Sequence, residues 1–201
     1  MLTFIQAFLG SIVVSTNLIP ATITMHMLFS LLMVGALVYC IVKVRATQFA
    51  GAFSHWDLNK VVWFNLIIGL TQIVLGTQVR ENVDVLKANP VETYTITERL
   101  LVMSHDLELH RLLSFGVVIS TIVLFMKVSA VQTHSIVKFA VNLSVVIVGL
   151  SMLTGIILYS YDIPAFAQPI HLTLGTLLSG AHLLILMVIW HSPKVAPVTV
   201  S

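Results

Sequence analysis

The chain has few charged residues, a single cysteine and no basic segment at its start. Charged residues make up 9% of its 201 residues, against roughly 25% in soluble domains. This composition excludes a soluble globular protein. Because Cys40 has no second cysteine to pair with, an internal disulfide and a cysteine-based metal site are also excluded. No basic segment precedes Leu2, so we expect the first apolar run to be retained rather than cleaved as a signal.

Long apolar runs fill most of the chain. Apolar residues make up 58% of it, and the mean hydropathy is +1.02. A helix needs about 20 apolar residues to cross a hydrocarbon core of about 30 Å. We therefore predict an all-α integral membrane protein with six transmembrane helices, of which the first is short. The predicted spans are Leu2–Ile19, Ala21–Val44, Val61–Val79, Leu101–Val128, Ile136–Tyr159 and Ala165–Trp190.

Basic residues gather on one side of this arrangement. If the spans alternate in direction, one side carries only Asp57 against six basic residues, which are Lys43, Arg45, Lys60, Lys127, Lys138 and Lys194. Basic loops stay in the cytoplasm, so we expect a multi-pass protein of the cytoplasmic membrane with both termini inside. The net charge of +2 reflects these loops and indicates no nucleic-acid partner.

The sequence contains an internal repeat, which covers residues 10–36 and 155–181. In each copy an apolar segment leads to an Ile-Pro-Ala turn, and a second apolar segment follows. The second segment carries a histidine, His26 in the first copy and His171 in the second, at the same distance from the glycine that opens the copy. A duplicated hairpin with a histidine in each copy predicts a duplicated site.

Three histidines, His26, His110 and His171, are expected at similar depth in apolar helices near the outer face. One such histidine alone would suggest an interhelical hydrogen bond, but three at matching heights favour binding of a buried cofactor. Zinc fits poorly, since no third close ligand completes a tetrahedral site. Two histidines from facing helices of a four-helix bundle suit the axial positions of a heme. We therefore predict that His110 and His171 bind the iron of a heme.

Two arginines are expected at the same outer face, and one further histidine follows His171 in its span. Arg80 and Arg111 are placed to pair with the anionic propionates of a heme. The alternative, that both side chains only extend to the membrane surface, is equally compatible with the sequence. His182 follows His171 on nearly the same helix face, about 16 Å deeper. No other histidine is expected at that depth, which favours a hydrogen-bonding role over a second heme.

Three stretches resemble the heme A synthase family: LTQIVLGTQVR (70–80), LHRLLS (109–114) and IPAFAQPIHLTLGTLL (163–178). Members of that family have eight spans in two pseudosymmetric four-helix halves, and this chain resembles the last six. The resemblance implies that residues 61–191 form a complete bundle that binds heme b through His110 and His171. Residues 1–44 would be the hairpin that remains of the first half, residues 45–60 a cytoplasmic loop and residues 192–201 a cytoplasmic tail.

The resemblance places His26 in the substrate site, where the family oxidises a methyl group of heme O to the formyl group of heme A. It also matches Arg80 to an arginine that, in the family, follows a motif of small residues. Two helices that would supply the partner of His26 have no counterpart, and neither has the glutamate that precedes their histidine. Leu107 stands at the corresponding position before His110.

Two functions remain open at this point. In the first, the chain is a heme A synthase-type oxidoreductase in cytochrome oxidase biogenesis, active only if a second membrane polypeptide supplies the missing helices. In the second, it is a non-catalytic b-type heme subunit of a respiratory complex, which transfers electrons or packs against its neighbours. Membrane lipid and heme are partners in both.

Overall fold

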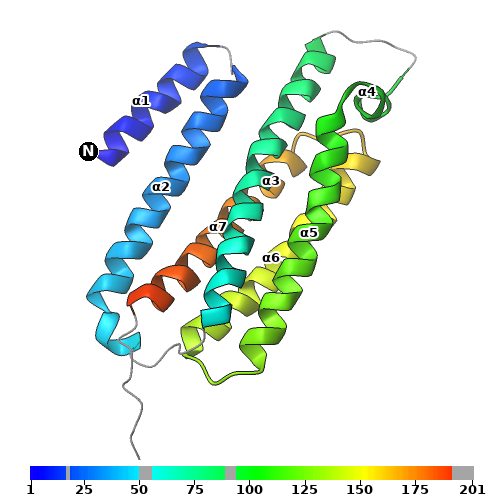
Figure 1. Cartoon of the computed structure of the whole chain (residues 1–201). Coiled ribbons are helices and arrows are strands. Elements are labelled where there is room, and N and C mark those ends of the chain that lie inside the picture. The colour runs from blue at the N-terminus through cyan, green and yellow to red at the C-terminus, as the bar shows by residue number, and fades with distance from the viewer. Residues whose placement is uncertain (17–18, 50–55, 89–93, 192–201) are drawn as a thin grey trace, which may run out of the picture.

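The computed structural model describes residues 1–16, 19–49, 56–88 and 94–191. Within these ranges the chain forms seven α-helices, one short 3-10 helix and no strand (Figure 1). The elements are α1 (Leu2–Ser15), α2 (Pro20–Val44), η1 (Ala46–Phe49), α3 (Trp56–Ala88), α4 (Ile96–Met103), α5 (His105–Ser129), α6 (Ser135–Ser160) and α7 (Ala167–His191). The predicted all-α class is confirmed for the described residues.

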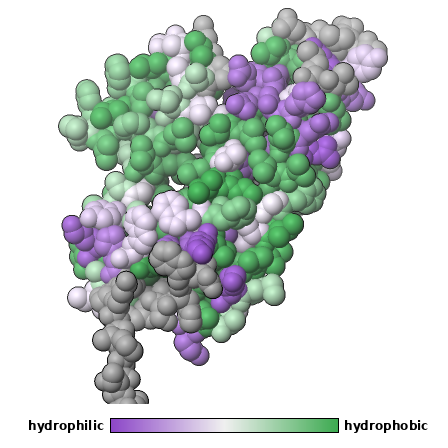
Figure 2. Space-filling model, viewed as in Figure 1, coloured by the Kyte–Doolittle hydropathy of each residue, from purple (hydrophilic) through white to green (hydrophobic). Residues whose placement is uncertain are grey.

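Five of these helices, α2, α3, α5, α6 and α7, are long and apolar enough to cross a membrane. Helix α1 has 14 residues, fewer than the roughly 20 that a full crossing needs, so it supports the sixth predicted span only as a short apolar helix. Figure 2 shows hydrophobic side chains over much of the visible surface, with hydrophilic ones gathered towards the two ends. These features are those of a multi-pass membrane protein.

Helices α3, α5, α6 and α7 pack around a shared core. Helices α3 and α6 each contact both α5 and α7, so that α5 and α7 lie diagonally across the group. The largest cluster of buried apolar side chains draws on all four helices, for example Leu66, Leu124, Val141 and Ile185. In lipid such a core stabilises the protein through close van der Waals packing rather than through removal of water.

The N-terminal hairpin lies at the edge of this group. Helix α2 packs against α7 and, less extensively, against α3, while α1 packs against α2. Helix α1 contains no buried residue and lies on the far side of α2 in Figure 1. The hairpin is therefore attached to the four helices mainly through α2.

Helix α3 extends further than the apolar run predicts. It continues past Val79 to Ala88, because no proline or glycine occurs before Pro90 to end it. The sequence between residues 80 and 88 is polar, so hydropathy alone ends the span early. The end of this helix therefore stands beyond the apolar region.

A short helix, α4, precedes α5. A capping box begins it: the Glu98 backbone N–H donates to the Thr95 hydroxyl, and the Thr95 backbone N–H donates to the Glu98 carboxylate at 2.8 Å. Ser104 has an extended backbone and separates α4 from α5. The Asn82 amide donates to the Ser104 hydroxyl at 2.9 Å, which stabilises this break. The single span predicted from Leu101 is thus two helices.

Candidate functional site

His110 on α5 and His171 on α7 are brought together in the interior of the four helices. Their ring centroids are 6.2 Å apart, and their ring planes form an angle of 61°. Because α5 and α7 are diagonal neighbours, side chains that point inward from both helices meet between them. Each histidine is partly buried. Two imidazoles from helices on opposite sides of the group therefore lie next to each other in its interior.

Each of these imidazoles lies against a glycine of an adjacent helix. A Cβ atom placed on Gly76 of α3 would lie 3.4 Å from Cε1 of His110 and 3.8 Å from its Nδ1. One placed on Gly155 of α6 would lie 3.5 Å from Cε1 of His171 and 4.0 Å from its Nδ1. The same edge of each ring, Nδ1–Cε1, therefore faces its glycine.

Hydrogen bonds engage the Nδ1 side of His171. Its Nδ1 lies 3.1 Å from the Ser151 carbonyl oxygen and 3.0 Å from the Thr154 hydroxyl oxygen. An Nδ1–H donated to a carbonyl favours the tautomer in which Nε2 carries the lone pair. Within the described residues, Nε2 of His171 forms no hydrogen bond. Nε2 is therefore the ring nitrogen through which His171 could hold a metal.

His110 is held through its backbone instead. The Gln72 side-chain amide donates to the His110 carbonyl oxygen at 2.8 Å. Nδ1 of His110 is buried and has no hydrogen-bond partner in the described part of the chain. Its Nε2 likewise forms no hydrogen bond there. Gln72 therefore positions the turn of α5 that carries the histidine, and the ring nitrogens remain available.

The histidine pair fits the axial positions of a heme. Two imidazoles that share one metal ion through bonds of about 2 Å have ring centroids roughly 6 Å apart, and the observed separation is 6.2 Å. Among the described residues, no group of three His, Cys, Asp or Glu side chains is placed to hold a metal ion. Two nitrogen ligands complete the coordination of a heme iron, whereas zinc needs four ligands from its surroundings.

The two predicted propionate partners lie at the same end of the bundle. Arg111 follows His110 directly, and its guanidinium lies 4.9 Å from the centroid of the Tyr159 ring. Arg80 lies one helical turn beyond Gly76, and its Nε is 3.4 Å from Oδ2 of Asp84. The side chains of Arg80 and Asp84 are 41% and 44% exposed, so their ion pair contributes little to stability. Arg111 is thus next to His110 in the chain and Arg80 lies one turn from Gly76, while both side chains contact other residues.

His26 is not part of the pair and bonds within its own hairpin. The Gln6 side-chain nitrogen lies 3.1 Å from Nε2 of His26 and donates to the His26 carbonyl oxygen at 3.2 Å. The same nitrogen also bonds the Ser30 hydroxyl. A Cβ atom placed on Gly10 would lie 3.2 Å from Cε1 of His26. The first copy of the repeat therefore reproduces the glycine contact but not the second imidazole.

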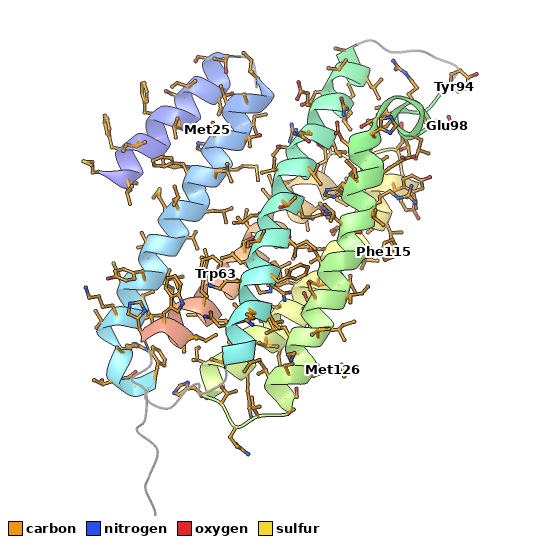
Figure 3. The ribbon with its side chains drawn as sticks, viewed as in Figure 1. Met25, Trp63, Tyr94, Glu98, Phe115 and Met126 are labelled. Atoms are coloured by element: carbon orange, nitrogen blue, oxygen red, sulfur yellow. The ribbon has the colours of Figure 1, made fainter. Side chains whose placement is uncertain are left out.

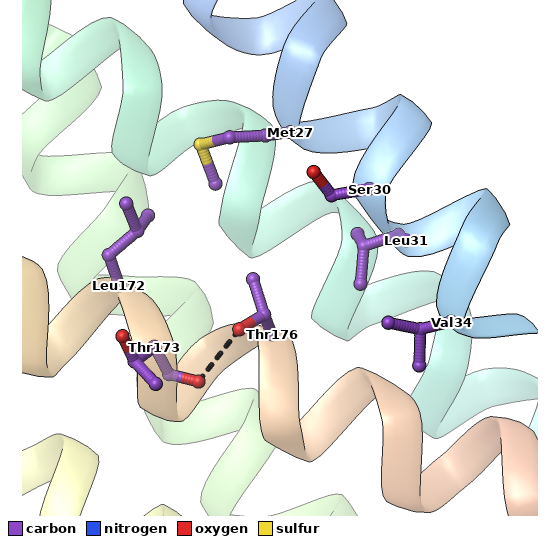
Figure 4. A pocket seen from close by; sticks show the side chains of 7 residues that line it. All are labelled: Met27, Ser30, Leu31, Val34, Leu172, Thr173 and Thr176. Carbon is purple, nitrogen blue, oxygen red and sulfur yellow. Dashed lines mark hydrogen bonds between the residues drawn. The ribbon is translucent and has the colours of Figure 1, made fainter. Parts of the chain in front are cut away.

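A cavity of about 250 Å³ lies between α2 and α7. Four residues of α2, from Met27 to Val34, and three of α7, from Leu172 to Thr176, line it (Figure 4). The Thr176 hydroxyl donates to the backbone carbonyl of residue 173 at 2.8 Å, and the other lining hydroxyls also donate to carbonyls of their own helices. The cavity therefore presents mainly hydrocarbon, next to the helix turns that carry the two repeat histidines.

Sequence reasoning missed a buried polar network centred on Asn65. Its amide donates to the carbonyl oxygens of Val61 and Ser120 at 2.9 and 3.2 Å. Its side-chain oxygen accepts from the hydroxyls of Ser120 and Thr121 at 3.1 and 3.3 Å. All three polar side chains are buried. The available signal was a lone asparagine inside an apolar run, since such residues in lipid normally find a partner.

His182 is fully buried on α7, deeper than the paired histidines. Neither of its ring nitrogens has a hydrogen-bond partner among the described residues. The hydrogen bond that the sequence favours for this residue is therefore not observed.

Figure 3 shows the described side chains of the whole chain as sticks, with Trp63 of α3 and Phe115 of α5 among those labelled.

Comparison with protein families identifies the chain. A family model described as cytochrome oxidase assembly protein, COX15-CtaA, matches residues 1–183. A search of curated proteins and a search of solved structures found no match. The matched residues include the two copies of the repeat and the three histidines described above. The predicted relationship to heme A synthases is confirmed, and the chain belongs to the COX15-CtaA family of cytochrome oxidase assembly proteins.

Proposed function

We propose that this protein binds heme b between His110 and His171 and acts in heme A biosynthesis for cytochrome oxidase assembly. The observation that carries the proposal is the meeting of these two imidazoles, with centroids 6.2 Å apart, on diagonal helices. Membership of the family supports the biosynthetic role. A heme with two histidine ligands supplies one-electron transfer and has no open position for oxygen.

The residues around the pair would each contribute to holding this heme. Ser151 and Thr154 keep the Nδ1 side of His171 engaged, which leaves Nε2 as its iron ligand. Arg80 and Arg111 would pair with the propionates by charge-assisted hydrogen bonds. For Arg80 this requires exchange of a half-exposed carboxylate, Asp84, for a propionate. Such an exchange costs little, because the ion pair is solvated.

We further propose that the protein lies in the cytoplasmic membrane, with both termini in the cytoplasm and the histidine pair near the opposite face. The basic loops support this orientation. His26 would belong to the site that oxidises heme O to heme A. That site needs two further helices from a second membrane polypeptide, and the peripheral position of α1 and α2 leaves the hairpin accessible to one.

One observation favours the second candidate function, a non-catalytic b-type heme subunit of a respiratory complex. Nε2 of His26 is already bonded to Gln6, so the nitrogen that would act on a second heme is engaged within its own hairpin. In this case the heme b site transfers electrons or has a structural role, and the N-terminal hairpin only packs against neighbouring chains.

Hemin titration of the purified full-length protein tests the heme b site. We expect one heme per chain, a low-spin difference spectrum and a heme b signal after pyridine extraction. The variant His110→Ala should lose binding, and the control variant His182→Ala should keep it. A wild-type protein that binds no hemin, or loss of heme in His182→Ala with retention in His110→Ala, would contradict the proposal.

Pigment analysis separates the two candidate functions. The protein is co-expressed with a source of heme O, with and without a membrane polypeptide that carries the two N-terminal helices of the family. Heme A that forms only with this polypeptide supports the synthase. If no heme A forms in either case while heme b is retained, the synthase role is wrong and the subunit remains.

A further inference from the structure

His26, His110 and His171 share one packing arrangement, although only His110 and His171 meet. Each imidazole presents Cε1 to a glycine of an adjacent helix. In each case the residue four positions before that glycine also contacts the histidine. The three sets are Gln6, Gly10 and His26, then Gln72, Gly76 and His110, then Ser151, Gly155 and His171.

Helix geometry explains why a glycine stands at this position. The carbonyl of residue i−4 accepts the backbone N–H of residue i, and a side chain at residue i covers this carbonyl from the side. With glycine at position 155, the Ser151 carbonyl stays open and accepts from Nδ1 of His171 at 3.1 Å. The imidazole therefore rests on bare backbone and bonds to it at the same time.

In the set on α3, Gln72 bonds to the backbone of the histidine rather than to its ring. Gln72 donates to the carbonyl oxygen of His110 at 2.8 Å, and Gln6 makes the equivalent bond to His26 at 3.2 Å. The glycine then receives the ring edge, while the glutamine holds the backbone of the histidine. One turn of the neighbouring helix thus restrains both the ring and the backbone of its histidine.

We infer that Gly76 and Gly155 are positioning residues for the two heme ligands, each setting the ring so that its Nδ1–Cε1 edge lies against backbone and Nε2 is left for the iron. This inference rests on the heme b site proposed above. Ligand orientation by such outer contacts commonly changes metal affinity by about 10–100-fold.

The other glycines that the structure describes lack this relation to histidine. Gly69 and Gly175 face Ser179 and Ile73, as expected for ordinary close packing of helices. Gly149 has nothing within 4 Å of its Cβ position. Because Gly149 lies on α6 together with Gly155, it provides a control for the general effect of replacing a glycine in this helix.

The experiment loads full-length Gly155→Val and Gly149→Val proteins with hemin and compares them with the wild type. The branched side chain at position 155 should displace His171, giving a high-spin ferric fraction, carbon monoxide binding in the ferrous state and about tenfold weaker heme binding. Free imidazole should restore the low-spin spectrum, because it replaces the displaced ligand. The wild type and Gly149→Val should stay low-spin and bind no carbon monoxide.

The outcomes separate this inference from the proposed function. If the wild type binds no heme, the proposed function fails and the inference fails with it. If the wild type binds heme and a folded Gly155→Val matches it in spin state and carbon monoxide binding, only the inference is overturned. Should Gly155→Val not fold, Gly76→Val replaces it, since its branched side chain lies against His110 as that of Gly155→Val lies against His171. A spin state and carbon monoxide binding identical to those of the wild type would then overturn the inference, and a high-spin fraction would support it.

Discussion

The two copies of the repeated hairpin hold their histidines in the same way but in different surroundings. In both, the imidazole lies on a glycine of the preceding helix. In α6 and α7 the histidine meets His110, and its Nε2 forms no hydrogen bond within the described chain. In α1 and α2, Nε2 of His26 is bonded to Gln6. A local sequence pattern therefore sets the depth and packing of a histidine, while the surrounding helices decide which groups its ring nitrogens meet.

The turns of the two copies also differ, although both contain Ile-Pro-Ala. Ile19 has an ordinary backbone, with φ −52° and ψ 129°. In the second copy Asp162 and Ile163 have positive φ values of 53° and 59°, which cost most for a β-branched residue such as isoleucine. The Asp162 carboxylate accepts the backbone N–H of Thr97 at 3.0 Å, which helps to stabilise this turn. The turn of the second copy thus contains two residues in a strained backbone conformation.

The largest difference between the copies should appear on removal of each histidine. We expect His171→Ala to reduce heme affinity by about 100-fold, since the iron loses a ligand and glycine at position 155 has no side chain that could replace it. His26→Ala should change it by less than about twofold, because His26 has no contact with the pair in the described chain. Hemin titration monitored at the Soret band measures both. Equal losses in the two variants would show that the copies share one heme.

A smaller difference should follow from the polar contacts to each histidine. Thr154→Val removes one partner of Nδ1 of His171 while the Ser151 carbonyl remains, so we expect a loss of heme affinity of about tenfold or less. Gln6→Leu removes the partner of His26 and should leave heme b binding unchanged. The reduction potential of the bound heme gives a second measurement. A shift of this potential in Gln6→Leu but not in Thr154→Val would contradict the assignment.

The smallest difference should come from the turns. Asn tolerates a positive φ better than Ala does, so Ile163→Asn should be less destabilising than Ile163→Ala by about 1 kcal/mol. At Ile19, where φ is negative, the two substitutions should be nearly equivalent. Reversible unfolding in mixed micelles measures the free energies of unfolding of the four variants. Equal stabilities of the two variants at position 163 would mean that the turn relaxes without strain.

The features that the sequence predicts well are those set within one helix or one hairpin. Apolar length predicts the spans, and the equal glycine-to-histidine spacing in two antiparallel hairpins places each histidine opposite its glycine. The pairing of His110 with His171 was predicted from their similar depth in apolar helices, but nothing in their spacing shows that α5 and α7 are diagonal neighbours.

The features that sequence reasoning missed depend on contacts between distant segments. The break at Ser104 is stabilised by Asn82, a residue of α3. The role of Asn65 is visible only when Ser120 and Thr121 lie beside it. The engagement of His26 by Gln6 requires the register of two packed helices. Hydropathy and composition carry no information about such partners, since the same residues would look alike in any arrangement of the helices.

The length of α3 has a further consequence. Its 33 residues extend about 50 Å at 1.5 Å per residue, well beyond a hydrocarbon layer of about 30 Å. The charged side chains from Arg80 onward keep the surplus in water, so the helix cannot sink to hide it. Gly76, and with it the histidine pair, would then lie only about 6 Å below the lipid boundary. A heme held by this pair would then lie close to electron donors on that side of the membrane, and electrons would not have to cross the bilayer to reach it.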